Sequence, residues 1–74
     1  MRFSDKVRIQ RQKHQITQEQ LAEYLSVSRQ AVSKYESGRS YPEVRNIIKL
    51  SQLFRVSIDY LLNDNIEDNE EITS

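Results

Sequence analysis

The 74 residues are enough for one small domain, close to the size at which a single apolar core only just suffices for folding. The absence of cysteine and the single histidine and glycine exclude disulfides, a credible transition-metal site and a glycine-rich phosphate loop. The formal net charge of zero conceals a net charge of +5 in residues 1–63, which hold all 11 lysines and arginines against 6 acids, so a nucleic-acid partner is not excluded.

Apolar spacing and capping residues predict an all-α chain with five helices, over residues 3–13, 18–25, 29–37, 44–54 and 58–63. Thr17, Ser28 and Ser57 stand just before the second, third and fifth helices, where their hydroxyls can accept from free backbone N–H groups. Gly38, the only glycine, is placed to end the third helix. Pro42 disfavours helix at the residue before it, and the linker Arg39-Ser-Tyr-Pro42 is read as a turn.

The same spacing predicts which side of each helix is buried. In the first helix, Phe3, Val7 and Arg11 fall on one stripe. The expected inward-facing residues of the other four helices are Leu21, Ala22 and Leu25; Ala31, Val32 and Tyr35; Val44, Ile47, Ile48, Leu50, Ser51 and Phe54; and Ile58, Leu61 and Leu62. On the third helix this leaves Arg29, Gln30, Ser33 and Lys34 facing outward. Two short capped helices, joined by a tight turn and with basic and amide side chains on the second, have the layout of a DNA-reading helix-turn-helix.

Four stretches carry a more specific signal: Thr17-Gln-Glu-Gln-Leu-Ala, Val27-Ser-Arg-Gln-Ala-Val-Ser-Lys-Tyr-Glu-Ser-Gly, Pro42, and Val56-Ser-Ile-Asp-Tyr-Leu-Leu. With these, residues 3–63 resemble the phage repressor and Cro type of helix-turn-helix domain, also called the xenobiotic-response-element type. The resemblance implies a compact five-helix bundle, similar to lambda repressor, that binds double-stranded DNA as a homodimer on a two-fold operator. It also implies transcriptional regulation, usually repression.

The first turn of the third helix is the part of this motif that enters the major groove, and Arg29 and Gln30 occupy it. An arginine can hydrogen-bond guanine O6 and N7 together, and a glutamine can pair with adenine N6 and N7, so both are expected to read bases. Ser33 and Lys34 follow within reach of bases or phosphates. Phosphate contacts are expected from helix starts and from the linker after the third helix: Gln18, Ser28, Arg39, Ser40 and Tyr41.

The resemblance adds two structural expectations. It pairs Arg11 with Glu36, which would fix the recognition helix on the first helix. It also places a dimer interface at Arg55, Val56, Ile58, Asp59 and Leu62. Many relatives have glycine at the turns that end the first, second and fourth helices, where this chain has Gln15, Ser26 and Arg55. A left-handed backbone there would cost about 1 kcal/mol per residue relative to glycine.

Residues 64–74 hold 5 acids and no base. Two isoleucines among these acids give too little apolar surface to offset the entropy of ordering, so the segment is read as a disordered acidic tail, with binding of a protein partner as the alternative. No second domain is expected after it. No apolar run suits a signal peptide or a membrane span, and the expected protein is cytoplasmic, without cofactor and not an enzyme.

Two alternatives to a repressor remain at this point. The first is an antitoxin or another partner-binding protein that represses its own operon. The second is a helix-turn-helix fold used for protein contacts alone, which the outward basic side chains disfavour.

Overall fold

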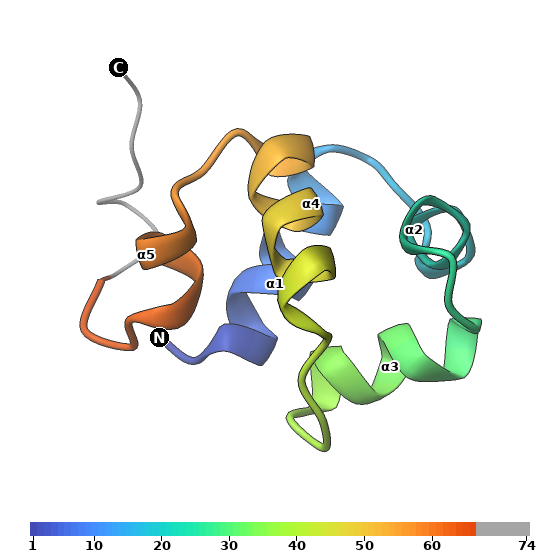
Figure 1. The fold of residues 1–74 in the computed structure, drawn as a ribbon, viewed down its shortest axis with the longest axis horizontal. Coiled ribbons are helices and arrows are strands. Elements are labelled where there is room, and N and C mark those ends of the chain that lie inside the picture. The colour runs from blue at the N-terminus through green and yellow to red at the C-terminus, as the bar shows by residue number, and fades with distance from the viewer. Residues whose placement is uncertain (67–74) are drawn as a thin grey trace.

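The computed structural model describes residues 1–66, and these residues contain five helices and no strand. The helices are α1 (Phe3–Lys13), α2 (Gln18–Leu25), α3 (Arg29–Ser37), α4 (Val44–Phe54) and α5 (Ile58–Leu62), as Figure 1 shows. The all-α prediction is confirmed. The fifth helix ends one residue earlier than predicted, because Asn63 has an extended backbone.

Three of the helices begin at the predicted caps. The Thr17 hydroxyl accepts from the Gln20 backbone N–H at 3.0 Å, and the Gln20 side chain accepts from the Thr17 N–H at 2.9 Å, a complete capping box. The Ser28 hydroxyl accepts from Ala31 and that of Ser57 from Tyr60 in the same way. These local bonds satisfy backbone groups that a short helix leaves without partners.

Four turns after helices use the left-handed backbone conformation. At Gly38, φ is +80° and costs nothing, because glycine has no Cβ. At Gln15, Ser26 and Arg55, φ is +57°, +59° and +59°, as the comparison with glycine-containing relatives suggested. Each of these three residues is therefore strained by about 1 kcal/mol relative to glycine.

The helices form two groups that share α1. α2 and α3 pack on each other, and α3 also packs on α1; α4 and α5 pack together on the other side of α1 (Figure 1). The core between them consists of Phe3, Val7, Leu21, Ala22, Leu25, Val32, Tyr35, Ile47, Leu50, Phe54, Val56, Tyr60 and Leu61. α1 thus touches both the helix-turn-helix and the C-terminal helices.

Several burial predictions were wrong. Val44 is 72% exposed, Ile48 and Ile58 are each 40% exposed, and Leu62 is 49% exposed. The buried stripe of α4 consists of Asn46, Ile47, Leu50 and Phe54, and it leaves Val44 and Ile48 outside. α5 has little more than one turn, and it turns Tyr60 and Leu61 inward instead of the residues on either side.

The segment over residues 63–66, directly after α5, is ordered by one internal hydrogen bond and by contacts with the folded domain. The Asn63 side chain accepts from the Asn65 N–H at 2.9 Å, the Asp64 carbonyl accepts from the Met1 amino group at 2.7 Å, and Ile66 packs against the core. The first part of the predicted tail is therefore packed on the domain. The rest, residues 67–74, lies outside the described residues. Within residues 1–66, no helix is both long and apolar enough to cross a membrane.

Candidate nucleic-acid interface

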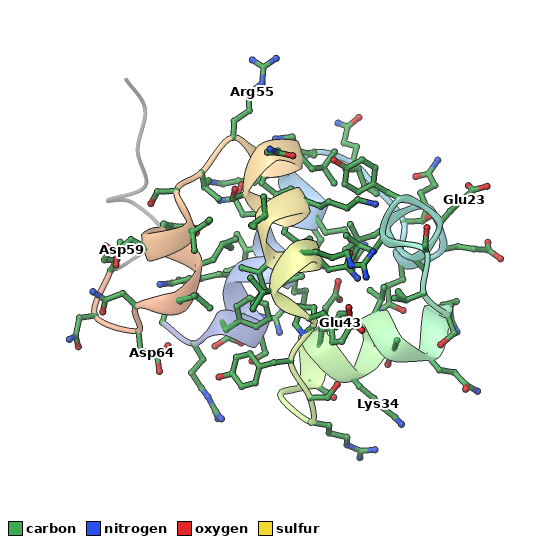
Figure 2. The ribbon with its side chains drawn as sticks, in the orientation of Figure 1. Glu23, Lys34, Glu43, Arg55, Asp59 and Asp64 are labelled. Atoms are coloured by element: carbon green, nitrogen blue, oxygen red, sulfur yellow. The ribbon has the colours of Figure 1, made fainter. Side chains whose placement is uncertain are left out.

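The outer face of α3 carries the four predicted DNA-contacting side chains. Arg29, Gln30, Ser33 and Lys34 are all exposed, while Val32 and Tyr35 on the inner face are buried. Figure 2 shows Lys34 pointing away from the body of the domain, on the side opposite Arg55. The structure thus brings the predicted residues onto one outward surface of one helix.

The first turn of α3 is held in place by its cap. The Ser28 hydroxyl accepts from the Ala31 N–H at 3.0 Å, which fixes the backbone from which Arg29 and Gln30 project. A hydroxyl that accepts a hydrogen bond still has its own proton to donate. Ser28 can therefore cap the helix and donate to a phosphate oxygen at the same time.

The predicted ion pair between Arg11 and Glu36 is present. Arg11 Nε donates to Glu36 Oε2 at 2.6 Å and Arg11 Nη2 donates to Oε1 at 3.2 Å, a two-bond geometry typical of strong arginine–carboxylate pairs. The two side chains are only 14% and 5% exposed. Arg11 Nη1 also donates to the Ile16 carbonyl at 2.8 Å. The pair joins α1 to the end of α3 and to the chain entering α2.

Gln18, at the start of α2, belongs to the same network. Its side-chain Nε2 donates to Glu36 Oε1 at 3.1 Å, so one amide N–H is used within the domain. An amide nitrogen has two N–H groups, and the second remains for a ligand. Sequence analysis assigned Gln18 to a phosphate and the ion pair to structure, whereas the structure joins all three side chains into one network.

The linker after α3 places three further candidates beside the recognition helix. Arg39 is exposed, Ser40 is half-buried, and the Arg39 N–H donates to the Lys34 carbonyl at 2.9 Å, which continues the helix end. Tyr41 is 66% exposed, and its ring lies 5.0 Å from that of Phe3. These contacts hold the linker against the start of α1 and leave its polar groups at the surface.

Behind α3, burial raises the pKa of Tyr35, and the nearby carboxylate of Glu43 raises it further. The phenol is therefore protonated at neutral pH. Within residues 1–66, no group of three histidine or acidic side chains is placed to hold a metal ion. The exposed chemistry of this side of the molecule is hydrogen bonding and positive charge.

The predicted dimer residues are on α5 and the turn before it. Arg55, Ile58, Asp59 and Leu62 are exposed, and Figure 2 shows Arg55 and Asp59 pointing away from the domain. Val56 is only 6% exposed and belongs to the core of its own chain. It therefore offers almost no surface to a partner and supports α5 from beneath.

Comparison with known proteins identifies the family. Residues 7–61 match a family model described as Helix-turn-helix. The chain belongs to this family. The chain is of the phage repressor and Cro type, as predicted from the sequence, since its structure is similar to that of a phage repressor.

Individual members have different regulatory roles. The chain is 48% identical over 63 residues to the HTH-type transcriptional activator BcrR of Enterococcus faecalis, which covers 85% of this chain and 31% of the relative. It is 33% identical over 61 residues to the cryptic phage CTXphi transcriptional repressor RstR of Vibrio cholerae, covering 82% of this chain and 54% of RstR. The helix-turn-helix chain thus spans a third to about half of these two relatives.

One solved structure extends the similarity to three dimensions. The P22 c2 repressor, crystallised with a synthetic operator, is 32% identical and superposes with a TM-score of 0.79. The match covers 85% of this chain and 96% of the repressor chain. The five-helix arrangement is therefore shared by a protein whose structure was determined on DNA.

Proposed function

We propose that this helix-turn-helix protein is a transcriptional regulator that binds double-stranded DNA as a homodimer at a two-fold operator and acts as a repressor. The observation that carries the proposal is the outer face of α3, where Arg29, Gln30, Ser33 and Lys34 are exposed together on a helix fixed from behind. Similarity to a repressor crystallised with its operator supports the same use of this face.

In this proposal, Arg29 and Gln30 read base edges. Both lie in the first turn of α3, whose backbone is held by the Ser28 cap. An arginine suits guanine and a glutamine suits adenine, because each can form two bonds to one base in the major groove. Ser33 and Lys34, farther along the same face, contact neighbouring bases or phosphates.

The phosphate contacts come from groups on either side of α3. Gln18 offers its second amide N–H, Ser28 its hydroxyl proton, and Arg39 its charge, with Ser40 and Tyr41 beside it. Arg11 contributes mainly through Glu36, since its guanidinium already donates three bonds within the domain. These groups fix the register of the domain on the duplex and carry no sequence information.

The proposed dimer interface is the exposed face of α5. Ile58 and Leu62 are one helical turn apart and are 40% and 49% exposed, with Asp59 and Arg55 beside them. A two-fold pairing of this face would place one α3 in each of two successive major grooves, with half-site centres about 34 Å apart. The operator should then be a pseudo-palindrome.

The test is selection of bound sequences from random duplex DNA, followed by footprinting on the selected site. The expected result is protection of two symmetric half-sites on one face of the duplex. Protection of a single asymmetric half-site at saturating protein would contradict the dimer, and recovery of no preferred sequence would contradict base reading by α3.

The direction of regulation needs its own experiment, since the named relatives include an activator and a repressor. A reporter gene is placed behind a promoter that overlaps the selected operator, and Arg29→Ala serves as the binding-deficient control. Repression predicts lower expression with the unmodified protein than with the variant. Higher expression would assign the protein to activation while leaving the proposed DNA contacts intact.

A further inference from the structure

Lys6, on α1, is a completely buried lysine that sequence analysis did not single out. Its ammonium donates to the carbonyl of Tyr60 at 2.5 Å and to that of Asn63 at 2.6 Å. The same nitrogen lies 4.8 Å from the centre of the Tyr60 ring. All three contacts are with α5 or the residue that follows it.

Burial of an ammonium is costly unless its donors are satisfied, so the position needs an explanation. Here the charge meets carbonyls at the C-terminal end of α5, where the helix dipole is negative. A helix of five residues has no stability by itself and depends on its end contacts and on packing. Ser57 caps the start of α5, and Lys6 holds its end.

A second contact lies one turn farther along α1. Gln10 Nε2 donates to the Tyr60 hydroxyl at 3.2 Å, and Gln10 is also completely buried. The next residue, Arg11, pairs with Glu36 of α3. α1 is therefore bonded to α5 through Lys6 and Gln10 and to α3 through Arg11.

We propose that Lys6 is a positioning residue that sets the spacing between operator half-sites. The inference rests on the proposed function, in which α5 joins the two copies. Because α1 fixes α5 and α3 to the same rigid element, the distance between the two recognition helices depends on how firmly α5 is held. Loss of the Lys6 contacts lets α5 shift on α1, and the dimer then accepts DNA with other spacings.

The structure provides a matched control. Lys49 Nζ also donates to a tyrosine carbonyl, that of Tyr24 at 3.3 Å, and lies 5.5 Å from the centre of the same ring. This contact joins α4 to α2 and does not involve α5. Lys49→Met removes a lysine–tyrosine contact of similar geometry away from α5, at a partly exposed position, whereas Lys6 is completely buried and has two carbonyl partners. Both variants leave an unbranched apolar side chain.

The experiment measures affinity for three duplexes: the selected operator and two versions whose half-sites are one base pair closer or farther apart. One base pair changes both the distance between the half-sites and their relative rotation about the DNA axis. The unmodified protein should therefore bind the two altered duplexes about tenfold or more weakly than the selected operator, the scale of a mismatched base pair. Lys49→Met should show the same loss. Lys6→Met should bind the three duplexes within about threefold of one another, because it removes two charge-assisted bonds that hold α5, each worth about tenfold in an equilibrium constant.

A half-site duplex separates positioning from folding. Lys6→Met should bind it as the unmodified protein does, and Lys6→Arg, which restores donors to the same carbonyls, should recover the spacing preference. If Lys6→Met does not fold, Gln10→Leu takes its place, since it removes the bond to Tyr60 with a side chain of similar size. It should reduce the preference in the same direction.

The outcomes distinguish the two proposals. If the unmodified protein binds all three spacings equally, the two-fold operator of the proposed function is wrong. If it prefers one spacing and the variant used keeps that preference in full, the inference about Lys6 is wrong. An equal loss of preference in Lys49→Met would also overturn it, because the effect would then be general loosening of the domain.

Discussion

The exposed faces of α3 and α5 differ in chemistry. α3 presents Arg29, Gln30 and Lys34, which water solvates well, whereas α5 presents Ile58 and Leu62 with roughly half of each side chain in solvent. Figures 1 and 2 place the two helices on different sides of the domain. Polar and charged groups suit a charged ligand, and clustered aliphatic groups suit a second apolar surface. Under the proposed function, this difference predicts that DNA binding is sensitive to salt and that dimerisation is sensitive to changes in apolar contact.

The largest expected difference between the two faces is in the response to salt of DNA binding and of dimerisation. Each neutralised phosphate releases about 0.9 counterion, so a dimer with six or more phosphate contacts should lose affinity for its operator by roughly 10³ between about 50 and 200 mM salt. The dimer dissociation constant should change far less over that range. Fluorescence anisotropy and sedimentation measure the two quantities. An operator affinity independent of salt would remove the basis for the phosphate contacts.

Dimerisation through the exposed face of α5 should weaken when a charged residue is placed on that face. Leu62→Asp places a carboxylate on each side of the proposed two-fold contact, and a buried unpaired charge costs about 3 kcal/mol or more. Dimerisation should weaken by about a hundredfold or more, while the urea midpoint of the isolated domain should hardly change, since Leu62 is 49% exposed. Glu23→Gln, on α2, is a control away from this face. A dimer that tolerates Leu62→Asp must be joined elsewhere.

On the α3 face, base-reading and phosphate-contacting residues should differ from each other. Arg29→Ala and Gln30→Ala should each lose about 1 to 3 kcal/mol of discrimination at particular base pairs, because each removes two bonds to one base. Arg39→Ala should weaken binding to all sequences alike. Competition assays with single-base operator variants measure both effects. A uniform loss in all three variants would contradict the division of roles.

The acidic segment should have the smallest effect. Residues 67–74 hold four carboxylates, tethered to a domain of opposite net charge, and they compete with phosphates for its basic surface. Truncation after Ile66 keeps the packed residues and should raise DNA affinity by about two- to fivefold at low salt, with no change near physiological salt. Lower affinity after truncation would instead assign these residues to the dimer or to the DNA interface.

Sequence alone predicted what is local in this fold. Thr17, Ser28 and Ser57 cap the predicted helices because capping depends on residues only three positions apart. The outward face of α3 was predicted because the spacing of its apolar residues defines the buried side and leaves the polar residues on the opposite side. The Arg11–Glu36 pair was predicted through the resemblance to a family, not through any local rule.

Long-range packing was not predictable in the same way. Lys6 and Gln10 occupy positions that, with Phe3 and Val7, follow the spacing of a buried face, but their polarity argues against burial. Both side chains bond to Tyr60 of α5, which lies 54 positions from Lys6 and 50 from Gln10 along the chain. The reverse error affected Ile58 and Leu62, whose apolar side chains suggest burial but which are exposed because Tyr60 and Leu61 form the inner face of α5.

The three strained turns should affect the lifetime of the protein. Compared with glycine at the same positions, Gln15, Ser26 and Arg55 together lower the free energy of unfolding by about 3 kcal/mol. This raises the unfolded fraction by about a hundredfold. Proteases degrade the unfolded fraction, so the chain should be shorter-lived after its synthesis stops than variants with glycine at these positions. Genes under its control would then respond within the lifetime of the protein instead of waiting for dilution by cell growth. Glycine at any of the three positions should lengthen that delay.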